Sequence, residues 1–499
     1  MKYRLFAAGF LFFLPLLLMA QNQQPVTDSM ALRTFRRQDL QEEFRFFRRA
    51  LEETHPGLYR YTPKAIMTAR LDSFYRQIKD NMPFYDYYRL MSALVSNVRC
   101  AHTVILPAED WQGFFMKQTQ LFPFGQILIR NRMYITLNQT SDTTIKPGYE
   151  IIFINGRPID AICRTIYQHT WGDGYSESLK RQTFNQGFFS FFYHLYVERT
   201  SQFLLTCKDF TGRIVTVKAP GLPMKAIQEN MAKNPVNKEI LRIYGDNGKK
   251  PGRELKLLND SSIAIMKLKD FGGSGPKGFP AFLENSMKEL KEKNIKNLVI
   301  DLRNNGGGWD SSGVLLFTYL INKTSRYYVR QHTITDSSEF LRYSDISKED
   351  LATIHEQLKK EPDGTFTLKP QYTPGVSWQN PKPDHYTGKV YFIINGASGS
   401  TTSEFIAAAQ GNELGVFIGE ESGGCHEGGN GGSFLHLVLP TSKIVINTPL
   451  VYYGNGGKPA AIKGRGTMPE YDVPDDMDYL LQGRDIQKEF VLKLIMKSK

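Results

Sequence analysis

The spacing of apolar residues divides the chain into segments of different periodicity. Through residues 38–98 apolar residues recur at helical spacing, and His55-Pro56-Gly57 interrupts the first run. We therefore expect a helical N-terminal region. Residues 112–220 carry short β-rich runs instead, and Asn155-Gly156 within the segment IIFINGRPI is typical of a hairpin turn. A small β-rich domain is predicted there.

From residue 255 onward the pattern predicts alternating strands and helices. SSIAIMKLKDF reads as a strand, FPAFLENSMKELKEKN as an amphipathic helix and IKNLVIDLR as a buried strand. Strand, helix and strand in this order indicate a βαβ unit and a mixed or parallel sheet. Residues 323–388 form a polar insertion with one helix-like piece at 348–360, which we interpret as a surface excursion or a lid. Residues 484–498 predict a closing helix.

The predicted fold class is therefore multi-domain α/β. A chain of 499 residues is too long for one ordinary core, so two to four domains are expected. The predicted division is a leader at 1–20, a helical region at 21–110, a β-rich domain at 111–220, a polar linker at 221–254 and an α/β domain at 255–499 that contains the insertion.

The first twenty residues have the pattern of a secretory signal peptide. Lys2 and Arg4 precede an apolar stretch from Ala7 to Leu18, and the small residue Ala20 stands before Gln21. The stretch is short for a spanning helix and contains a proline. We expect an exported protein, periplasmic or extracellular, without a stable membrane span.

Charge and cysteine usage exclude some functions. The net charge of +12 is spread along the chain without a dense basic cluster, so no nucleic-acid partner is expected. The four cysteines, Cys100, Cys163, Cys207 and Cys425, allow three disulfide pairings or four free thiols. The sequence has no CxxC and no HExxH, and we expect no metal and no cofactor.

Two motifs carry the candidate chemistry. NGASGSTTSEF at 395–405 places a hydroxyl-rich turn between an apolar strand and a helix-like run, and such an elbow can present a serine nucleophile. LVIDLRNNGGG at 298–308 places glycines after another apolar strand, where bare backbone N–H groups can approach a reacting oxygen. An attacker and an oxyanion site together indicate acyl transfer.

These motifs, in this order and followed by FIGEESGG, resemble the tail-specific serine peptidases, which include the carboxy-terminal-processing and tricorn-type proteases. KPGYEIIFINGRPI resembles the PDZ segment of that family, and VSNVRCAHTVI resembles the segment that carries a histidine in its tricorn-like branch. The resemblance implies a helical N-terminal region, a PDZ-like domain that captures peptides, and an α/β catalytic domain.

The resemblance implies that Ser400 is the nucleophile and that His102 is its base. The spacing from the serine to the following acid is one residue longer than in the common family pattern, which leaves Thr401 as an alternative nucleophile. The lysine of the carboxy-terminal-processing branch has no counterpart here, and His426 is the rival base. For the oxyanion site the resemblance suggests backbone N–H groups of Gly307, or a neighbouring glycine, and of Thr401.

The orienting acid is missing from its usual position, where this chain has Lys463. Among the acids, Glu470 is our candidate, with Glu427 and Glu421 as alternatives. A backbone carbonyl or a polar side chain could also orient the imidazole. The predicted function is a secreted serine endopeptidase that cleaves peptides or proteins. The alternative is a weakly active or inactive protein on the same scaffold that binds peptides or apolar ligands.

Overall fold

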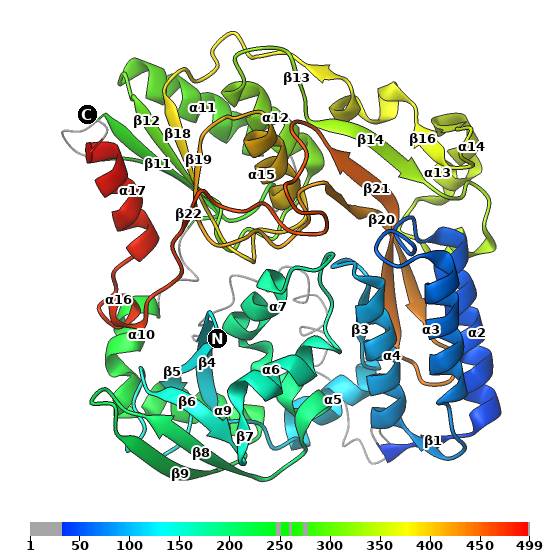
Figure 1. Ribbon diagram of the computed structural model, residues 1–499, viewed down its shortest axis with the longest axis vertical. Helices are drawn as coiled ribbons and strands as arrows, with labels where there is room; N and C mark the ends of the chain where they lie inside the picture. The colour runs from blue at the N-terminus through cyan, green and yellow to red at the C-terminus, as the bar shows by residue number, and fades with distance from the viewer. Residues whose placement is uncertain (1–31, 246–250, 259–261, 273–277, 498–499) are drawn as a thin grey trace.

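The structure is a computed structural model that describes residues 32–245, 251–258, 262–272 and 278–497. The predicted leader at 1–20 lies outside these residues. The described residues form three six-stranded β-sheets and two small two-stranded ones, and Figure 1 shows helices packed around and between the sheets. The described helices include none that is both long and apolar enough to cross a membrane.

The sheet of the C-terminal half forms the centre of the α/β domain. Its strand order is β10-β11-β12-β18-β19-β22, with β10 antiparallel to β11 and every other neighbouring pair parallel. The predicted βαβ unit is present as β11, α11 and β12. The strands are β10 (Arg253–Leu257), β11 (Ile263–Leu268), β12 (Asn297–Asp301), β18 (Lys389–Ile394), β19 (Val416–Gly419) and β22 (Tyr471–Asp472).

Strand alternation gives this sheet two buried faces. On β12, Leu298 and Ile300 pack into the core with the helices of one face, while Val299 between them packs with α17 on the other face. The helices of the first face are α11 (Gly278–Glu292), α12 (Asp310–Leu320) and α15 (Thr401–Gly411), and the predicted closing helix is α17 (Ile486–Lys497). A short helix, α16 (Met477–Leu481), precedes α17.

A second sheet joins the N-terminal helices to this domain. Its order is β15-β16-β14-β21-β20, and β3 pairs with β21 in antiparallel register, Ile105 opposite Ile446. Because β3 directly follows α4, this pairing fixes the helical region against the α/β domain (Figure 1). The strands are β3 (Val104–Leu106), β14 (Tyr328–Thr333), β15 (Leu358–Lys360), β16 (Phe366–Leu368), β20 (Gly428–Val438) and β21 (Val445–Asn455).

The interpretation of residues 323–388 as a surface excursion or lid is wrong. Its strand β14 lies inside the second sheet, and Tyr327 and Tyr328 are fully buried in the core against α12. The aromatic residues of this segment supply the apolar surface that a lid would lack. The segment also holds β13 (Ser325–Arg326), α13 (Lys348–Ala352), α14 (Ile354–Gln357), β17 (Trp378–Gln379) and the 3₁₀ turns at Glu339–Tyr343, Pro370–Tyr372 and Pro374–Val376.

The N-terminal region is helical as predicted. Its first helix ends at Thr54, directly before His55-Pro56-Gly57. The helices are α2 (Arg37–Thr54), α3 (Lys64–Arg76), α4 (Phe84–Val98) and α5 (Glu109–Gln118), with a small pairing between β1 (Thr34–Phe35) and β2 (Met82–Pro83).

The third sheet lies in the region predicted to be a β-rich domain, and its strand order is β4-β5-β6-β8-β9, with β7 paired to β6. The PDZ resemblance of this region stays a prediction. The strands are β4 (Phe124–Ile129), β5 (Arg132–Asn138), β6 (Glu150–Ile154), β7 (Arg157–Pro158), β8 (Gln202–Lys208) and β9 (Ile214–Pro220). Between β7 and β8 run α6 (Ile159–Tyr167), α7 (Ser178–Thr183), α8 (Phe189–Phe192) and two π-helical turns, Phe184–Phe188 and Tyr193–Val197.

The segment predicted as a polar linker is partly helical. It holds α9 (Met224–Lys233), α10 (Lys238–Tyr244) and a 3₁₀ turn, Pro235–Asn237. The four cysteines are all buried and free, so the structure has none of the three disulfide pairings.

Candidate active site

Ser400 stands at a sharp turn between β18 and α15. Its backbone angles are φ 53° and ψ −134°, a conformation in which a non-glycine residue is strained. The residue directly precedes α15, but its side chain does not cap that helix. The strained turn therefore leaves the Ser400 hydroxyl at the carboxyl edge of a parallel sheet, where α/β folds place their sites.

The neighbouring hydroxyls are all engaged in the structure of the turn. The Ser398 hydroxyl donates to the Leu302 carbonyl at 2.9 Å, and the Thr401 hydroxyl donates to the Gly308 carbonyl at 2.8 Å. The Thr402 and Ser403 hydroxyls donate to Asn305 Oδ1 and to the Ser400 carbonyl, each at 2.7 Å. Thr401, the alternative nucleophile, thus has a structural hydrogen bond that Ser400 lacks.

His102 reaches Ser400 from the N-terminal region. It lies in the turn between α4 and β3, and the pairing of β3 with β21 brings this turn to the end of the α/β domain. His102 Nε2 is 3.2 Å from Ser400 Oγ, although 298 residues separate them in the sequence. This is the distance expected between a serine nucleophile and its base.

The surroundings of His102 favour its neutral form. Burial lowers the pKa of His102 below its usual value of 6.5, while the negative charge of Asp173 and a backbone hydrogen bond to Asn430 act in the opposite direction. Asp173 is buried and accepts a hydrogen bond from the backbone N–H of Ala101 at 2.8 Å. A neutral imidazole beside a serine hydroxyl can accept its proton.

A second histidine, His55, hydrogen-bonds to the residue that follows His102 in the turn. His55 Nδ1 accepts a hydrogen bond from the Gly57 N–H, so Nε2 carries the proton and donates to Thr103 Oγ1 at 2.8 Å. Burial lowers the pKa of His55 to about 4, so it stays uncharged at neutral pH. His55 therefore fixes the residue that follows His102.

The rival base, His426, is occupied elsewhere. Its Nδ1 is 2.9 Å from Thr467 Oγ1 and its Nε2 is 3.2 Å from the Lys458 carbonyl. Both ring nitrogens therefore have structural partners, and neither of these partners is Ser400.

The prediction of Glu470 as the orienting acid is wrong. Its carboxylate accepts hydrogen bonds from the Phe417 N–H on β19 and from Gln410 at the far end of α15. Because an α-helix rises about 1.5 Å per residue, Gln410 is roughly 15 Å from the turn that holds Ser400. Glu470 joins the end of β19 to α15 and does not contact His102.

The other two candidate acids hold the loop around Lys463. Glu421 pairs with Arg465 at 2.6 Å, and Glu427 accepts from the Gly464 N–H at 2.9 Å. Lys463 itself is exposed. Lys463, at the position where an acid was expected, therefore faces solvent.

The glycine loop packs directly on the nucleophile turn. A side-chain carbon on Gly307 would lie 2.6 Å from Ser400 Cβ, so only glycine fits at this position. The Gly307 N–H, however, donates to Asn305 Oδ1 at 3.0 Å and is not free for an oxyanion, which leaves the predicted alternative, a neighbouring glycine. The Thr401 N–H stands at the first position of α15, where the backbone has no intrahelical acceptor.

Gly308 has the geometry that was expected of Gly307. It is exposed, and its carbonyl faces the N-terminus of α15, where it accepts from Thr401. Phe271 pairs with the loop through Gly307 and Trp309, on the opposite side of the strand. The Gly307 carbonyl points to Phe271, and the N–H of a trans peptide points opposite to its carbonyl, so the Gly308 N–H faces away from Phe271, as does the Gly308 carbonyl that bonds Thr401.

The sequence did not reveal three residues of this site. Asp173 lies in the loop before α7, Asn430 lies on β20, and Glu404 lies one helical turn after Ser400 with only 8% of its surface exposed. Glu404 could have been noticed from its i+4 spacing to Ser400. Asp173 and Asn430 gave no local signal, because only the folded chain brings them to His102.

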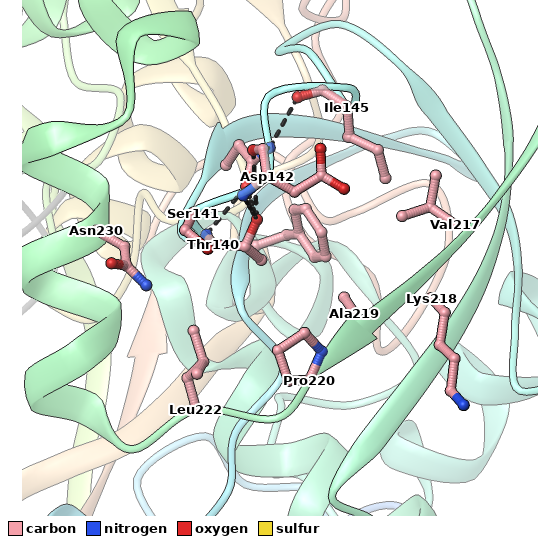
Figure 2. A pocket seen from close by; sticks show the side chains of 12 residues that line it. Thr140, Ser141, Asp142, Ile145, Val217, Lys218, Ala219, Pro220, Leu222 and Asn230 are labelled. Carbon is pink, nitrogen blue, oxygen red and sulfur yellow. Dashed lines mark hydrogen bonds between the residues drawn. The ribbon is translucent and has the colours of Figure 1, made fainter.

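A hollow elsewhere in the protein does not belong to this site. It lies in the third-sheet region between β5, β9 and α9, and Figure 2 shows the side chains that line it, among them Thr140, Asp142 and Lys218. Ser400 and His102 are not among its lining residues. In the described part of the chain, no cluster of three or more His, Cys, Asp or Glu side chains is suited to bind a metal ion.

Residues 262–473 match the model of peptidase family S41. The α/β domain of the chain is thus similar to the S41 peptidases. The matched segment holds Ser400, the glycine loop and the α/β sheet, while His102 precedes it. No curated protein sequence matches the chain.

Solved structures support the same fold. Mature CPAF is 13% identical with a TM-score of 0.60, and the alignment covers 92% of this chain and 96% of that chain. Mature CPAF in complex with lactacystin is 12% identical with a TM-score of 0.62, over 92% of this chain and 97% of that chain. At these identities the likeness concerns the fold alone, and it extends over the helical and β-rich regions as well as the family segment.

Proposed function

We propose that this serine peptidase cleaves peptide bonds through an acyl-enzyme on Ser400, with His102 as general base. The observation that carries the proposal is the 3.2 Å separation of His102 Nε2 and Ser400 Oγ at a strained turn whose other hydroxyls are engaged. Peptides or proteins are the substrates that similarity to this peptidase family implies.

The chemistry follows from this arrangement. His102 Nε2 takes the proton of Ser400 as Oγ bonds to the substrate carbonyl carbon. The resulting oxyanion accepts hydrogen bonds from the N–H groups of Thr401 and Gly308, and each such donor typically contributes about 3 kcal/mol to transition-state stabilisation. The C–N bond then breaks as His102 returns its proton to the leaving amine. His102 then takes a proton from water as the water oxygen bonds to the acyl carbon. The bond from that carbon to Ser400 Oγ breaks, His102 returns the proton to Oγ, and the acid is released.

In this proposal Asp173 replaces the orienting acid that was expected at position 463. Its charge acts on His102 from a buried position and favours the imidazolium that forms during each proton transfer. The backbone of Asn430 acts on the pKa of His102 in the same direction. Asp173 is thus a positioning residue, since it also holds the backbone of Ala101 next to His102.

Hydrolysis assays on single variants test the proposal. Ser400→Ala and His102→Ala should each lower kcat/KM on fluorogenic peptides and denatured casein by at least about 10³-fold. Ser311→Ala and His355→Ala, at exposed positions outside the site, should match the wild type. Retention of full activity in Ser400→Ala would exclude the mechanism.

Export and PDZ-type substrate capture complete the proposal. The pattern of residues 1–20 supports a secreted protein cleaved after Ala20, which N-terminal sequencing of the mature protein tests. Resemblance of residues 146–159 to a PDZ segment supports capture of extended peptides by the third-sheet region. Titration of the Ser400→Ala protein with peptides that carry a free or an amidated C-terminus tests this part.

A further inference from the structure

Two carboxyl groups flank Ser400 without a cationic partner. Glu404 follows Ser400 by one turn of α15, and because helical side chains tilt toward the N-terminus, its carboxyl lies beside the nucleophile turn. Asp310 begins α12, directly after the glycine loop that packs on Ser400. The two carboxyls thus approach the nucleophile from different elements.

The hydrogen bonds of these carboxyls are incomplete. Glu404 Oε2 accepts from the Tyr328 hydroxyl at 2.6 Å, and Asp310 Oδ1 accepts from the backbone of Ser311. Among the described residues, no donor reaches Glu404 Oε1 or Asp310 Oδ2. A carboxyl group has acceptor sites on both oxygens, so each can accept a further donor.

A third polar group, the hydroxyl of Tyr327, belongs to the same place. A side chain on Gly313 of α12 would collide with this hydroxyl and press on the methyl group of Thr401, so Tyr327 points between α12 and α15. Tyr327 is fully buried, and no described group is within hydrogen-bond geometry of its hydroxyl. The neighbouring Tyr328 hydroxyl acts on the pKa of Tyr327, but the Tyr328 hydroxyl donates its own proton to Glu404.

We call Asp310, Glu404, Tyr327, Tyr328 and Tyr453 the acidic wall. The negative charges of Asp310 and Glu404 both act on all three tyrosines, which places the five groups together. Burial, together with the charges of Asp310 and Asp173, raises the pKa of Glu404 to about 7, although the hydrogen bond from Tyr328 acts in the opposite direction. No lysine or arginine of the described chain offsets these charges. Buried carboxyls without a counter-charge destabilise a protein unless a ligand supplies that charge.

The acidic wall borders the Ser400 turn and the glycine loop, between which the attacked carbonyl must lie. His102 protonates the leaving amine, so the leaving group must lie on the side of His102. The charge of Asp173 acts on both His102 and Glu404, whereas Asp310, at the end of the glycine loop, acts on Glu404 and on the tyrosines. The wall therefore borders the substrate residue that becomes the acyl group.

We infer that the acidic wall is a specificity pocket for a cationic side chain, lysine or arginine, at the residue whose carbonyl Ser400 attacks. An ammonium or guanidinium group would donate to the free oxygens of Glu404 and Asp310 and would neutralise their charge. Of the three tyrosines only Tyr453 is partly exposed, and its ring would pack on the aliphatic stem and the cation. The inference rests on the proposed function, because it names the substrate preference of the same site.

Matched substrates and covalent probes test it. Arginine and citrulline have nearly the same shape and differ in charge, so peptide amides that differ only in this residue isolate the wall's effect. We expect kcat/KM for arginine to exceed that for citrulline by at least about 30-fold, since one buried charge pair contributes about 2 kcal/mol or more. Glu404→Gln should reduce the ratio to within about threefold, Asp310→Asn should reduce it partly, and Glu413→Gln, at an exposed position, should leave it unchanged.

Diphenyl phosphonates with the same two side chains give a readout without turnover, and any labelling of Ser400 shows that the variant has folded. Faster labelling by the arginine probe, with the preference lost in Glu404→Gln, supports the inference. Equal labelling of the wild type by both probes would overturn it while leaving Ser400 as the nucleophile. Failure of both probes and of a neutral fluorophosphonate to label Ser400 would overturn the proposed function, and the inference with it.

Discussion

At the scale of single residues, the site depends on where protons lie before the reaction starts. His102 and His55 are both neutral at pH 7 because burial lowers their pKa values, but only His102 has a serine hydroxyl as its neighbour. His55 uses its proton to hold Thr103. Two similar side chains therefore have different roles, set by their partners.

The lowered pKa of His102 predicts where kcat/KM falls on the acidic side of the pH profile, the acid limb. A base with a pKa below 6.5 loses its function only when the pH falls below that value. We expect kcat/KM for a substrate with a neutral acyl-side residue to stay high at pH 6.5 and to fall with a midpoint below it. A pH profile from 4.5 to 9 measures this, and a midpoint at 7 or above would contradict the account.

Asp173→Asn should change both rate and pH dependence. The charge of Asp173 raises the pKa of His102, so its removal moves the acid limb to still lower pH. The imidazolium also loses stabilisation, and we expect kcat to fall by roughly tenfold to a hundredfold. The amide keeps an oxygen for the Ala101 N–H, so the fold should persist. Asp142→Asn, at an exposed position of the third-sheet region, is the control; a rate loss without a pH shift would indicate a purely structural role.

At the scale of elements, the glycine loop and the start of α15 fit each other closely. Gly307 has φ +106° and lies against Ser400, whereas Gly306 faces open space with no neighbour within 4 Å of an added carbon. A side chain therefore fits at Gly306 but not at the adjacent Gly307, and alanine substitutions at the two positions test this difference.

Gly307→Ala should destabilise the protein and abolish activity. Strain at a positive φ and overpacking each contribute about 1–3 kcal/mol, and the collision displaces Ser400 itself. We expect at least about a hundredfold loss in kcat/KM and a lower urea midpoint. Gly306→Ala should resemble the wild type in both measurements. Equal behaviour of the two variants would contradict the packing described here.

Sequence patterns predicted those elements whose signal is local. The βαβ unit, the helices of residues 38–98 and the turn that presents Ser400 all follow from periodicity and motif. The burial of Tyr327 and Tyr328 was not predicted, because their segment is polar on average and its pairing partner β21 lies more than a hundred residues away. Glu470 was predicted from its place in a motif. Its actual contacts depend on β19, whose position beside it the motif does not predict.

At the scale of the whole molecule, the active site is assembled between two regions. Ser400, Gly308 and Glu404 come from the α/β domain, and His102 comes from the helical region that β3 joins to β21. Matching of the family model begins only after His102. The base was predictable through a resemblance of sequence, but its proximity to Ser400 follows from the strand pairing.

The buried Glu404 predicts how the stability of the whole protein depends on pH. Its pKa is raised to about 7 in the folded protein, above the value near 4.5 of an exposed glutamate. Its neutral form is therefore fully tolerated below pH 4.5, and stability is lost as the pH rises through 7. Glutamine cannot ionise, so Glu404→Gln removes this loss. We expect the unfolding free energy of the variant, relative to the wild type, to increase by up to about 3 kcal/mol from pH 5 to pH 8. Urea unfolding of both proteins at pH 5 and at pH 8 measures this difference in unfolding free energy. A difference that is the same at both pH values would show that Glu404 is ionised in the folded protein.

The central claim is that His102 activates Ser400, and covalent labelling tests it most directly. The mature protein is treated with a fluorophosphonate at pH 7–8, and mass spectrometry locates the adduct. The account predicts one adduct on Ser400, its absence in Ser400→Ala and its near loss in His102→Ala. An adduct on Thr401, or no adduct on the folded protein, would contradict the account, and the second result would favour a peptide-binding protein on a peptidase scaffold.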